Sequence, residues 1–356
     1  MKETMLTNIH QEKDVLSKIL IEFEEKNRDL IFAISQEKIK NILILATGSS
    51  MNSALSIKYF LEKSLDTVVH IEEPFNYYNY EKVDGNIDLI VGISQSGKSA
   101  STIKAMEYVQ KNTNSKTVVL TSNPTSPITQ YTDYVLDLNM GIENVGFVTK
   151  GFSATLLNMI LFSLYIGKEK GNISLDEFNK KLSTLNKMIE LVPTVISKTE
   201  KYFERNQKYF KDCERFICIG YGACIGISKE FETKFTETVR YPSQGFELEA
   251  YMHGPYLEAN KKHCLFYLDC EGFLSERLNS LKNYMQDYVG FSSIIGFGKD
   301  KEKDLNFDIE KVDEDLLILL MVIPIQLLSY RIAYLKGVNL EIRIFDDFDN
   351  VLKSKI

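Results

Sequence analysis

Small, hydroxyl-bearing residues gather in one short stretch, Ser94-Gln-Ser-Gly-Lys-Ser99, directly after the apolar run Leu89–Ile93. The apolar run predicts a buried strand, and the amphipathic stretch Ala100–Gln110 that follows the loop predicts a helix. At the start of a helix the backbone N–H groups lack helical partners, and the helix dipole favours negative charge. These residues therefore predict a site for an anion such as a phosphate group.

The same loop has a second interpretation. Gly92–Ser99 fits the pattern of a nucleotide-binding P-loop, because Lys98-Ser99 follows the second of two suitably spaced glycines. A P-loop protein also needs an apolar strand that ends in a metal-binding aspartate, and the best candidate, Asp137, fits poorly. The P-loop interpretation also leaves the remaining motifs of the chain unexplained, so it is the weaker one.

A second group of reactive side chains is predicted on a helix. Glu230, Lys234 and Glu237 are spaced by four and three residues, which places them on one helical face. A solvated face with an incidental Glu–Lys pair has the same spacing, so the spacing alone leaves both interpretations open. The neighbouring face, which we expect to be buried, carries Phe231, Phe235 and Val239.

His253 stands apart from the other histidines because Gly254-Pro255 follows it and would hold it on a defined turn. Of the others, His263 lies in a Lys-Lys-His run that we expect to be exposed. A carboxylate and an imidazole near one site are suited to proton transfer at neutral pH. Glu237 and His253 are therefore candidate acid–base residues.

The elements that must position these residues alternate between strand and helix in the first half of the chain. This alternation predicts a parallel sheet covered on both faces, with ligands beyond the carboxyl ends of its strands. Two polar turns, Thr47–Ser53 and Ser94–Ser99, lie at that edge. The predicted strands are 41–46, 67–71, 89–93, 116–120 and 134–138, and the predicted helices are 9–32, 54–63, 100–110 and 151–166.

The second half of the chain repeats this pattern after a charged helical stretch, Ser174–Gln207, in which Pro193 is expected to start or break a helix. Arg215–Gly220 and the turn after it echo the first strand and turn, at a spacing of about 175 residues. Where the first copy has its serine-rich loop, the second has Asp269-Cys-Glu-Gly272. Two carboxylates would repel a phosphate, so the anion site is assigned to the first copy only.

Composition narrows the class of protein. The 356 residues are 44% hydrophobic and 26% charged with a net charge of −7, as in soluble globular proteins, and no Lys/Arg block indicates a nucleic-acid partner. Five cysteines without a Cys-x-x-Cys pair argue against a zinc site or disulfide framework and favour a reducing cytoplasm. No signal peptide is predicted. The run Leu316–Leu328 is shorter than a membrane span of about 18 residues, so we expect a buried or interface helix.

Several motifs together resemble proteins with two sugar isomerase (SIS) domains, especially the isomerase half of glucosamine-6-phosphate synthase and the fructosamine-6-phosphate deglycases. The resemblance covers nearly the whole chain. It implies an α/β fold of two SIS-type domains in tandem, each a flavodoxin-like, three-layer αβα parallel sheet. The motifs that carry it are Ala46–Ser53, Ile93–Gly97, Glu143–Lys150, Glu230, Lys234, Glu237 and His253–Pro255.

The resemblance also implies a division of the chain. A first SIS domain with an N-terminal helix spans 1–168, and a helical connector spans 169–211. A second SIS domain spans 212–336, and a tail, 337–356, closes over the active site. Lys353 resembles a lysine near the end of the synthase that helps to open the sugar ring. The preceding stretch 337–349 departs from the synthase and is longer, so a solvated terminal lysine is the alternative.

Further roles follow from the resemblance. The two serine-rich turns would hold the sugar phosphate, Glu237 would move a proton between C1 and C2, and His253 would assist ring opening. Glu230 and Lys234 would line the site and position the base. The implied catalytic residues are Glu237, His253 and Lys353, and the implied substrate-binding residues are Gly48, Ser50, Ser94, Gln95, Ser96, Ser99, Glu230 and Lys234.

The implied function is a sugar-phosphate deglycase that cleaves a 6-phosphofructosamine to glucose 6-phosphate and a free amine. Tyr256, the aromatic residue after His253-Gly-Pro, is closer to the deglycases than to the synthase. The alternatives are an isomerase or deaminase of an amino-sugar phosphate and a non-catalytic sugar-phosphate-binding regulator. Too little chain precedes the first strand for a glutaminase domain, so we do not expect a self-sufficient glutamine-dependent synthase.

The remaining expectations concern partners and location. We expect no metal and no cofactor, because proton transfer of this kind needs neither. We expect a cytoplasmic homodimer with shared active sites, in which the histidine is donated across the interface. We expect neither a nucleic-acid nor a membrane partner.

Overall fold

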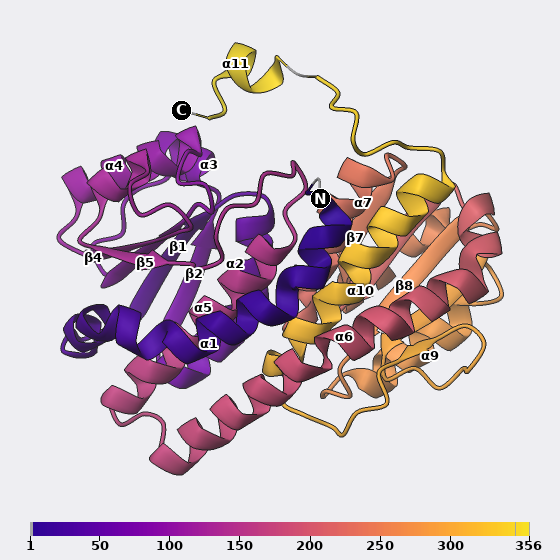
Figure 1. Cartoon of the computed structure of the whole chain (residues 1–356), viewed down its shortest axis with the longest axis horizontal. Helices are drawn as coiled ribbons and strands as arrows, with labels where there is room; N and C mark the ends of the chain where they lie inside the picture. The colour runs from indigo at the N-terminus through magenta and orange to yellow at the C-terminus, as the bar shows by residue number, and fades with distance from the viewer. Residues whose placement is uncertain (1–2, 346, 356) are drawn as a thin grey trace. The chain divides into compact units, whose positions relative to one another are not determined.

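The computed structural model describes residues 3–345 and 347–355 and contains two five-stranded parallel sheets with helices around them (Figure 1). The predicted fold class is therefore confirmed. The strands are β1 (Asn41–Ala46), β2 (Val68–Glu72), β3 (Leu89–Ile93), β4 (Lys116–Thr121), β5 (Tyr134–Asp137), β6 (Arg215–Gly220), β7 (Ser243–Glu247), β8 (His263–Asp269), β9 (Phe291–Gly296) and β10 (Leu305–Asn306).

The helices follow the strands in the alternation that the sequence predicts. They are α1 (Met5–Ser35), α2 (Ser49–Leu65), α3 (Pro74–Tyr80), α4 (Ala100–Asn112), α5 (Lys150–Glu169), α6 (Leu175–Asp212), α7 (Cys224–Thr238), α8 (Leu248–Met252), α9 (Ser275–Met285), α10 (Glu314–Leu335) and α11 (Phe348–Leu352). Short 3₁₀ turns cover Pro127–Tyr131 and Pro255–Glu258.

The described residues form two compact units, each built around one sheet. The β1–β5 unit contains residues 14–144, 150–183, 343–345 and 347–355, and the β6–β10 unit contains residues 3–13, 145–149 and 184–342. The two units interleave along the chain, whereas the sequence-based division runs in consecutive segments. The last residues of the chain thus belong to the same unit as the serine-rich loop.

The sheet of the β1–β5 unit has the strand order β2-β1-β3-β4-β5, and every pair is parallel. After β1 the chain adds β2 at one edge of the sheet. It then crosses to the other side of β1 and adds β3, β4 and β5 in turn. A sheet of this order binds ligands beyond the carboxyl ends of the two central strands, at its topological switch point. The two serine-rich turns follow β1 and β3, so the fold brings both to that point.

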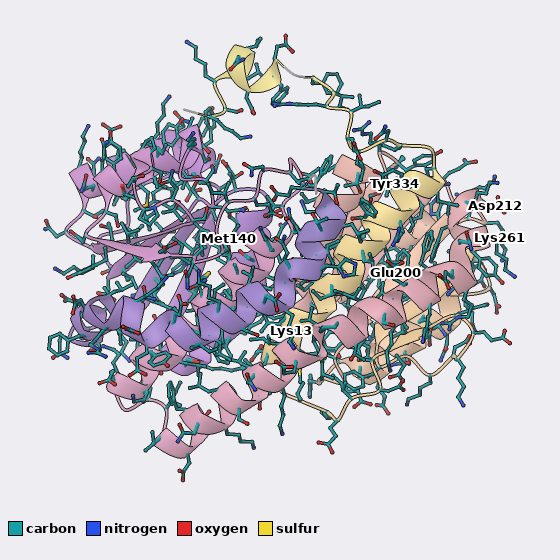
Figure 2. All side chains as sticks on the ribbon, in the orientation of Figure 1. Lys13, Met140, Glu200, Asp212, Lys261 and Tyr334 are labelled. Carbon is teal, nitrogen blue, oxygen red and sulfur yellow. The ribbon has the colours of Figure 1, made fainter. Side chains whose placement is uncertain are left out.

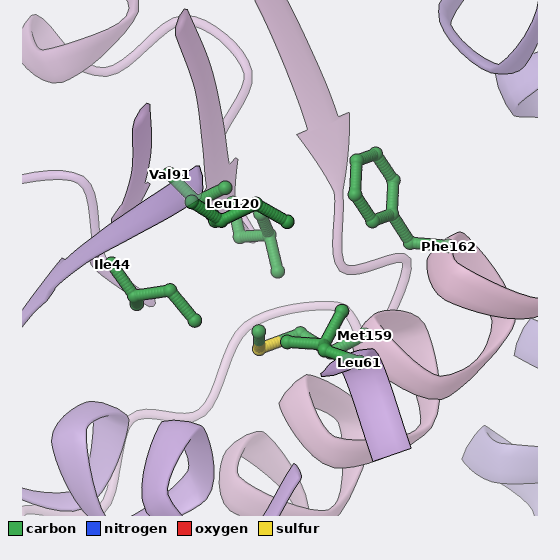
Figure 3. A pocket seen from close by; sticks show the side chains of 7 residues that line it. Ile44, Leu61, Val91, Leu120, Met159 and Phe162 are labelled. Atoms are coloured by element: carbon green, nitrogen blue, oxygen red, sulfur yellow. The ribbon is translucent and has the colours of Figure 1, made fainter. Parts of the chain in front are cut away.

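Alternate residues of β1 face opposite sides of this sheet, as expected for a strand. Leu43 and Leu45 belong to a buried cluster with residues of α3 and α4. Ile42 and Ile44 lie on the other side, where they line a small apolar cavity with residues of α2 and α5 (Figure 3). Because both faces are covered by helices, the strand is apolar and buried from Ile42 to Ala46, which explains its continuous apolar run.

The sheet of the β6–β10 unit has the order β10-β9-β8-β6-β7. Read from the β7 edge, its strands follow the same order along the chain as those of the first sheet read from the β2 edge. One face packs against α8 and α9 through a cluster that includes Ile219, Tyr251 and Leu278. The other face carries stacked and tilted aromatic rings, among them Phe231 and Phe235 of α7, whose ring centroids lie 3.8 Å apart. The predicted internal repeat is therefore a repeat of topology.

Two helices are long and apolar enough to cross a membrane by length and composition, α5 and α10. The most apolar window of α5 is completely buried within the structure, and that of α10 is 89% buried. Burial of this extent is typical of core helices. The expectation that Leu316–Leu328 forms a buried helix is thus confirmed, and Pro324 lies inside α10.

Three local expectations were wrong, and two edge strands were missed. Pro193 lies inside α6, which continues on both sides of it, so it neither starts nor breaks a helix. Helix α2 already begins at Ser49, which leaves only Thr47-Gly48 as a turn. His263 is 6% exposed because it begins the central strand β8. The edge strands β7 and β10 were not predicted.

Candidate active site

The turn after β1 leads directly into helix α2. Gly48 precedes the helix with φ +58°, a conformation that favours glycine because other residues meet steric strain there. Its carbonyl accepts the N–H of Asn52 at 3.0 Å, and Ser50 follows in the first turn. The helix therefore presents its amino end, where N–H groups lack helical partners, beyond the carboxyl end of β1.

The turn after β3 is more tightly fixed. Ser94 is 5% exposed, and its N–H donates to the carbonyl of Leu120 on the neighbouring strand β4 at 3.0 Å. Gly97 has φ +66°, and a Cβ atom there would lie 1.8 Å from Oγ of Ser126. The loop can therefore close only with glycine at this position, and it leaves Ser96 exposed at its tip.

Helix α4 begins directly after this loop, with Ser99 as its N-cap residue. The hydroxyl of Thr102 donates to Oγ of Ser99 at 3.0 Å, which fixes the first turn. The N–H of Ala100 donates to the carbonyl of Ser354 at 3.1 Å, and Ser99 forms an antiparallel bridge with Lys355. The tail of the chain therefore lies against the amino end of α4.

Lys353 is the residue before this contact. It has φ +51° and ends the short helix α11, and it is exposed. Its place in the chain thus puts it next to the loop that is predicted to hold phosphate, within one compact unit. Sequence patterns gave no sign of the pairing between Ser99 and Lys355, because a single bridge leaves no periodic signal.

Gln95 occupies the centre of the loop in an arrangement that the sequence does not predict. Its side-chain Nε2 donates to Oε2 of Glu143 at 3.0 Å and lies 3.7 Å from Sδ of Met140, which Figure 2 labels. The same carboxylate oxygen accepts the N–H of Gly151 at 3.1 Å. Glu143 thus connects the loop to the first turn of α5.

The three charged residues of α7 lie together as their spacing predicts. Nζ of Lys234 lies 2.7 Å from Oε2 of Glu237 and 3.5 Å from Oε1 of Glu230. The side chains of Lys234 and Glu230 are fully buried, whereas that of Glu237 is 39% exposed. The solvated-face interpretation is therefore wrong for Glu230 and Lys234.

Burial alone would lower the pKa of Lys234, but the two carboxylates outweigh it and raise that pKa above its ordinary value. Lys234 is thus a permanent ammonium at neutral pH. The group places a buried positive charge beside a carboxylate that remains open to solvent.

His253 follows α8 as its C-cap residue, and its side chain is 74% exposed. Its Nε2 lies 3.4 Å from Oε1 of Glu249 on the same turn. Within the described part of the chain, His253 and Glu237 make no hydrogen bond or ion pair with each other. The structure thus brings together Glu230, Lys234 and Glu237, which we call the α7 group, but leaves His253 exposed to solvent.

The switch point of the β6–β10 unit is arranged differently. The carboxylate of Asp269, at the end of β8, accepts hydrogen bonds from the side chains of Tyr221 at 2.9 Å and Ser275 at 2.8 Å. A Cβ atom on Gly272 would lie 1.7 Å from Oε2 of Glu314, so a carboxylate already occupies the space above this turn. These charges support the assignment of a single anion site to the β1–β5 unit.

Comparison with known proteins agrees with this architecture. Residues 27–165 match the family model described as SIS domain. The glutamine–fructose-6-phosphate aminotransferase (isomerizing) of Francisella tularensis is 25% identical over 360 residues, which cover 96% of this chain and 57% of that protein. The chain thus spans little more than half the length of this curated relative.

Solved structures cover nearly the whole chain. A protein proposed to be a phosphosugar isomerase from Clostridium difficile 630 has a TM-score of 0.90 and 26% identity, covering 99% of this chain and 98% of that one. The C-terminal domain of glucosamine-fructose-6-phosphate aminotransferase from Francisella tularensis has a TM-score of 0.83 and 22% identity, covering 95% and 98%.

The fold and the family match together define the class. The chain has an α/β fold of two five-stranded parallel sheets, which matches the architecture of tandem SIS domains, and the SIS family model itself matches residues 27–165.

Proposed function

We propose that this protein is an enzyme that moves a proton between C1 and C2 of a sugar 6-phosphate or of its amine adduct. The observation that carries the proposal is the α7 group, in which the buried ammonium of Lys234 lies 2.7 Å from the carboxylate of Glu237. The side chain of Glu237 is 39% exposed, so its carboxylate can reach a bound substrate.

The phosphate is assigned to the turns that follow β1 and β3. Gly48, Ser94, Gln95, Ser96 and Ser99 belong to these turns, and Ser50 lies in the first turn of α2. Two helix amino ends, those of α2 and α4, meet the switch point of the sheet, and their N–H groups and dipoles favour an anion. Phosphate held in this way fixes one end of the sugar.

Glu237 is assigned as the base and Lys234 and Glu230 as the residues that position it. In a ketoamine, Glu237 removes a proton from C1 to give an enaminol and returns it to C2, which gives an aldimine. Water then hydrolyses the aldimine to the aldose 6-phosphate and the free amine. A positioned base contributes about 10²–10⁴-fold to such a step.

His253 and Lys353 are assigned to ring opening. Both side chains are exposed, and Lys353 follows α11 directly before the tail contacts the start of α4. The exposure of His253 is consistent with a homodimer in which this imidazole completes the site of the partner subunit. Light scattering tests the dimer, and a monomer at working concentration would count against it.

The substrate is proposed to be a 6-phosphofructosamine, so the enzyme is a deglycase. Tyr256 after His253-Gly-Pro supports this choice, and it lies 38% exposed in the short turn beyond α8. The aminotransferase relative is described as isomerizing, which supports a second candidate, an isomerase or deaminase of an amino-sugar phosphate.

A substrate panel tests the proposal. The protein is incubated with 6-phosphorylated fructosamines, with fructose 6-phosphate plus ammonia, and with glucosamine 6-phosphate, with Glu237→Gln as the control. Release of glucose 6-phosphate from the first group alone supports the deglycase. Turnover of the amino-sugar phosphates supports the second candidate. Binding of sugar phosphates without turnover of any of them would overturn the enzyme and leave a regulatory binder.

A further inference from the structure

The backbone of Gln95 is anchored to the end of β4. Its carbonyl accepts the N–H of Ser122 at 2.8 Å, the hydroxyl of Ser122 at 2.8 Å and the hydroxyl of Thr121 at 3.2 Å. Three donors on one carbonyl fix the orientation of the peptide that joins Gln95 to Ser96. The backbone N–H groups beyond it therefore have a defined direction.

The side chain of Gln95 is anchored on a different element. Oε2 of Glu143 accepts both Nε2 of Gln95 at 3.0 Å and the N–H of Gly151 at 3.1 Å. Gly151 belongs to the first turn of α5, so one carboxylate oxygen joins the loop to a helix that is buried in the core. Hydrogen bonds to an ionised acceptor are stronger than those between neutral groups.

The close packing of the Gln95 side chain against residue 151 requires glycine at that position. A Cβ atom at this position would lie 2.3 Å from Nε2, 2.4 Å from Cδ and 2.6 Å from Oε1 of Gln95. The amide plane of Gln95 thus lies against the Cα atom of Gly151, and an alanine there would displace it. The hydrogen bond to Glu143 would be lost or distorted with it.

We propose that Glu143 and Gly151 are positioning residues for the Ser94–Ser99 loop, which they hold in the conformation that receives a phosphate group. This inference rests on the proposed function, since it concerns the same anion site. The loop is made of small residues that could adopt many conformations. A loop that is ordered before binding does not lose that freedom when the ligand arrives, so affinity rises.

The test compares four variants: Glu143→Ala, Glu143→Gln, Gly151→Ala and, as a matched control, Gly85→Ala, where a Cβ atom has open space. Affinity for fructose 6-phosphate and for inorganic phosphate is measured by calorimetry. Glu143→Ala and Gly151→Ala are expected to weaken binding about tenfold, the effect of one charge-assisted hydrogen bond. Glu143→Gln retains an acceptor oxygen but loses the charge, so it should weaken binding less than Glu143→Ala does, and the control should stay near wild type.

Kinetics and hydrogen exchange supply readouts that a loss of overall stability would not mimic. With a turned-over substrate, KM should rise in Gly151→Ala while kcat stays unchanged. The amides of residues 94–99 should exchange faster in Glu143→Ala and Gly151→Ala than in wild type, whether or not a ligand is present.

Each failure has a distinct meaning. If wild type binds neither probe, the proposed function fails, and the exchange rates of the loop still test the positioning. Wild-type affinity and exchange in both Glu143→Ala and Gly151→Ala would overturn the inference while leaving the proposed function intact. Equal loss in Glu143→Gln and Glu143→Ala would overturn it too, because the acceptor oxygen that Glu143→Gln retains would then do nothing to hold the loop.

Discussion

Replacing Lys234 by methionine should destabilise the protein far more than replacing any lysine on its surface. The variant keeps the length of the side chain but removes an ammonium that lies 3.5 Å from Glu230 and 2.7 Å from Glu237. Glu230 is fully buried, so its carboxylate would lose a counter-charge in a region that water does not reach. Breaking a buried ion pair from one side costs about 3–5 kcal/mol of unfolding free energy.

Helix α7 supplies its own control. Nζ of Lys229 lies 3.0 Å from Oε2 of Glu232, but the two side chains are 41% and 39% exposed. Lys229→Met should therefore cost at most about 1 kcal/mol. The assay is urea unfolding of both variants and wild type. Equal losses in Lys234→Met and Lys229→Met would refute the reasoning.

The double variant Glu230→Gln/Lys234→Met tests the cause. It removes the buried carboxylate together with its ammonium, so most of the lost stability should return. If the double variant is as unstable as Lys234→Met, the loss does not arise from charge.

The difference in unfolding free energy between wild type and Lys234→Met should depend on pH with a definite sign. The pKa of Lys234 is raised above its ordinary value of 10.5 in the folded protein. A group of this kind contributes its full stability below the unfolded pKa and loses it as the pH rises through the folded pKa. The difference between wild type and Lys234→Met should therefore stay constant from pH 7 to about 9 and shrink above about 10.5.

Three further predictions concern other parts of the molecule. Gly97→Ala should cost about 1–3 kcal/mol in urea unfolding, since φ is +66° and Ser126 leaves no room, whereas Gly85→Ala should be neutral. Lys353→Ala should lower kcat at least tenfold without a change in melting temperature, because its side chain is exposed; unchanged kcat would make it a solvated terminal lysine. Burial lowers the pKa of His263, so stability should fall as the pH drops below about 6.5 and should fall less in His263→Gln.

The elements that the sequence predicted well are those with strong local patterns. The strand Leu89–Ile93 and the beginning of helix α4 agree with their predicted limits, because both faces of this central strand are covered and every residue is apolar. The switch-point position of the serine-rich turns followed from the alternation of strands and helices. The edge strand β7, Ser243-Gln-Gly-Phe-Glu247, lacks such a run and was missed for that reason.

The burial of the α7 group could not be read from its spacing. A solvated stripe and a buried ion cluster share the same intervals of three and four residues. What decides between them is α10, which packs against α7 and whose Ser329 carbonyl accepts the hydroxyl of Thr238 at 3.2 Å. The contact between Gln95 and Glu143 was likewise hidden, because it joins residues 48 positions apart without any periodic pattern.

The central claim, that Glu237 moves a proton between C1 and C2, is tested most directly by isotope exchange. Wild type and Glu237→Gln are incubated in D₂O with the sugar phosphate that binds, and deuterium entry at C1 is followed by NMR. Wild type should incorporate deuterium, and Glu237→Gln should lose at least 10²-fold in rate while its affinity for the sugar phosphate stays unchanged. Incorporation at the wild-type rate in Glu237→Gln would contradict the claim.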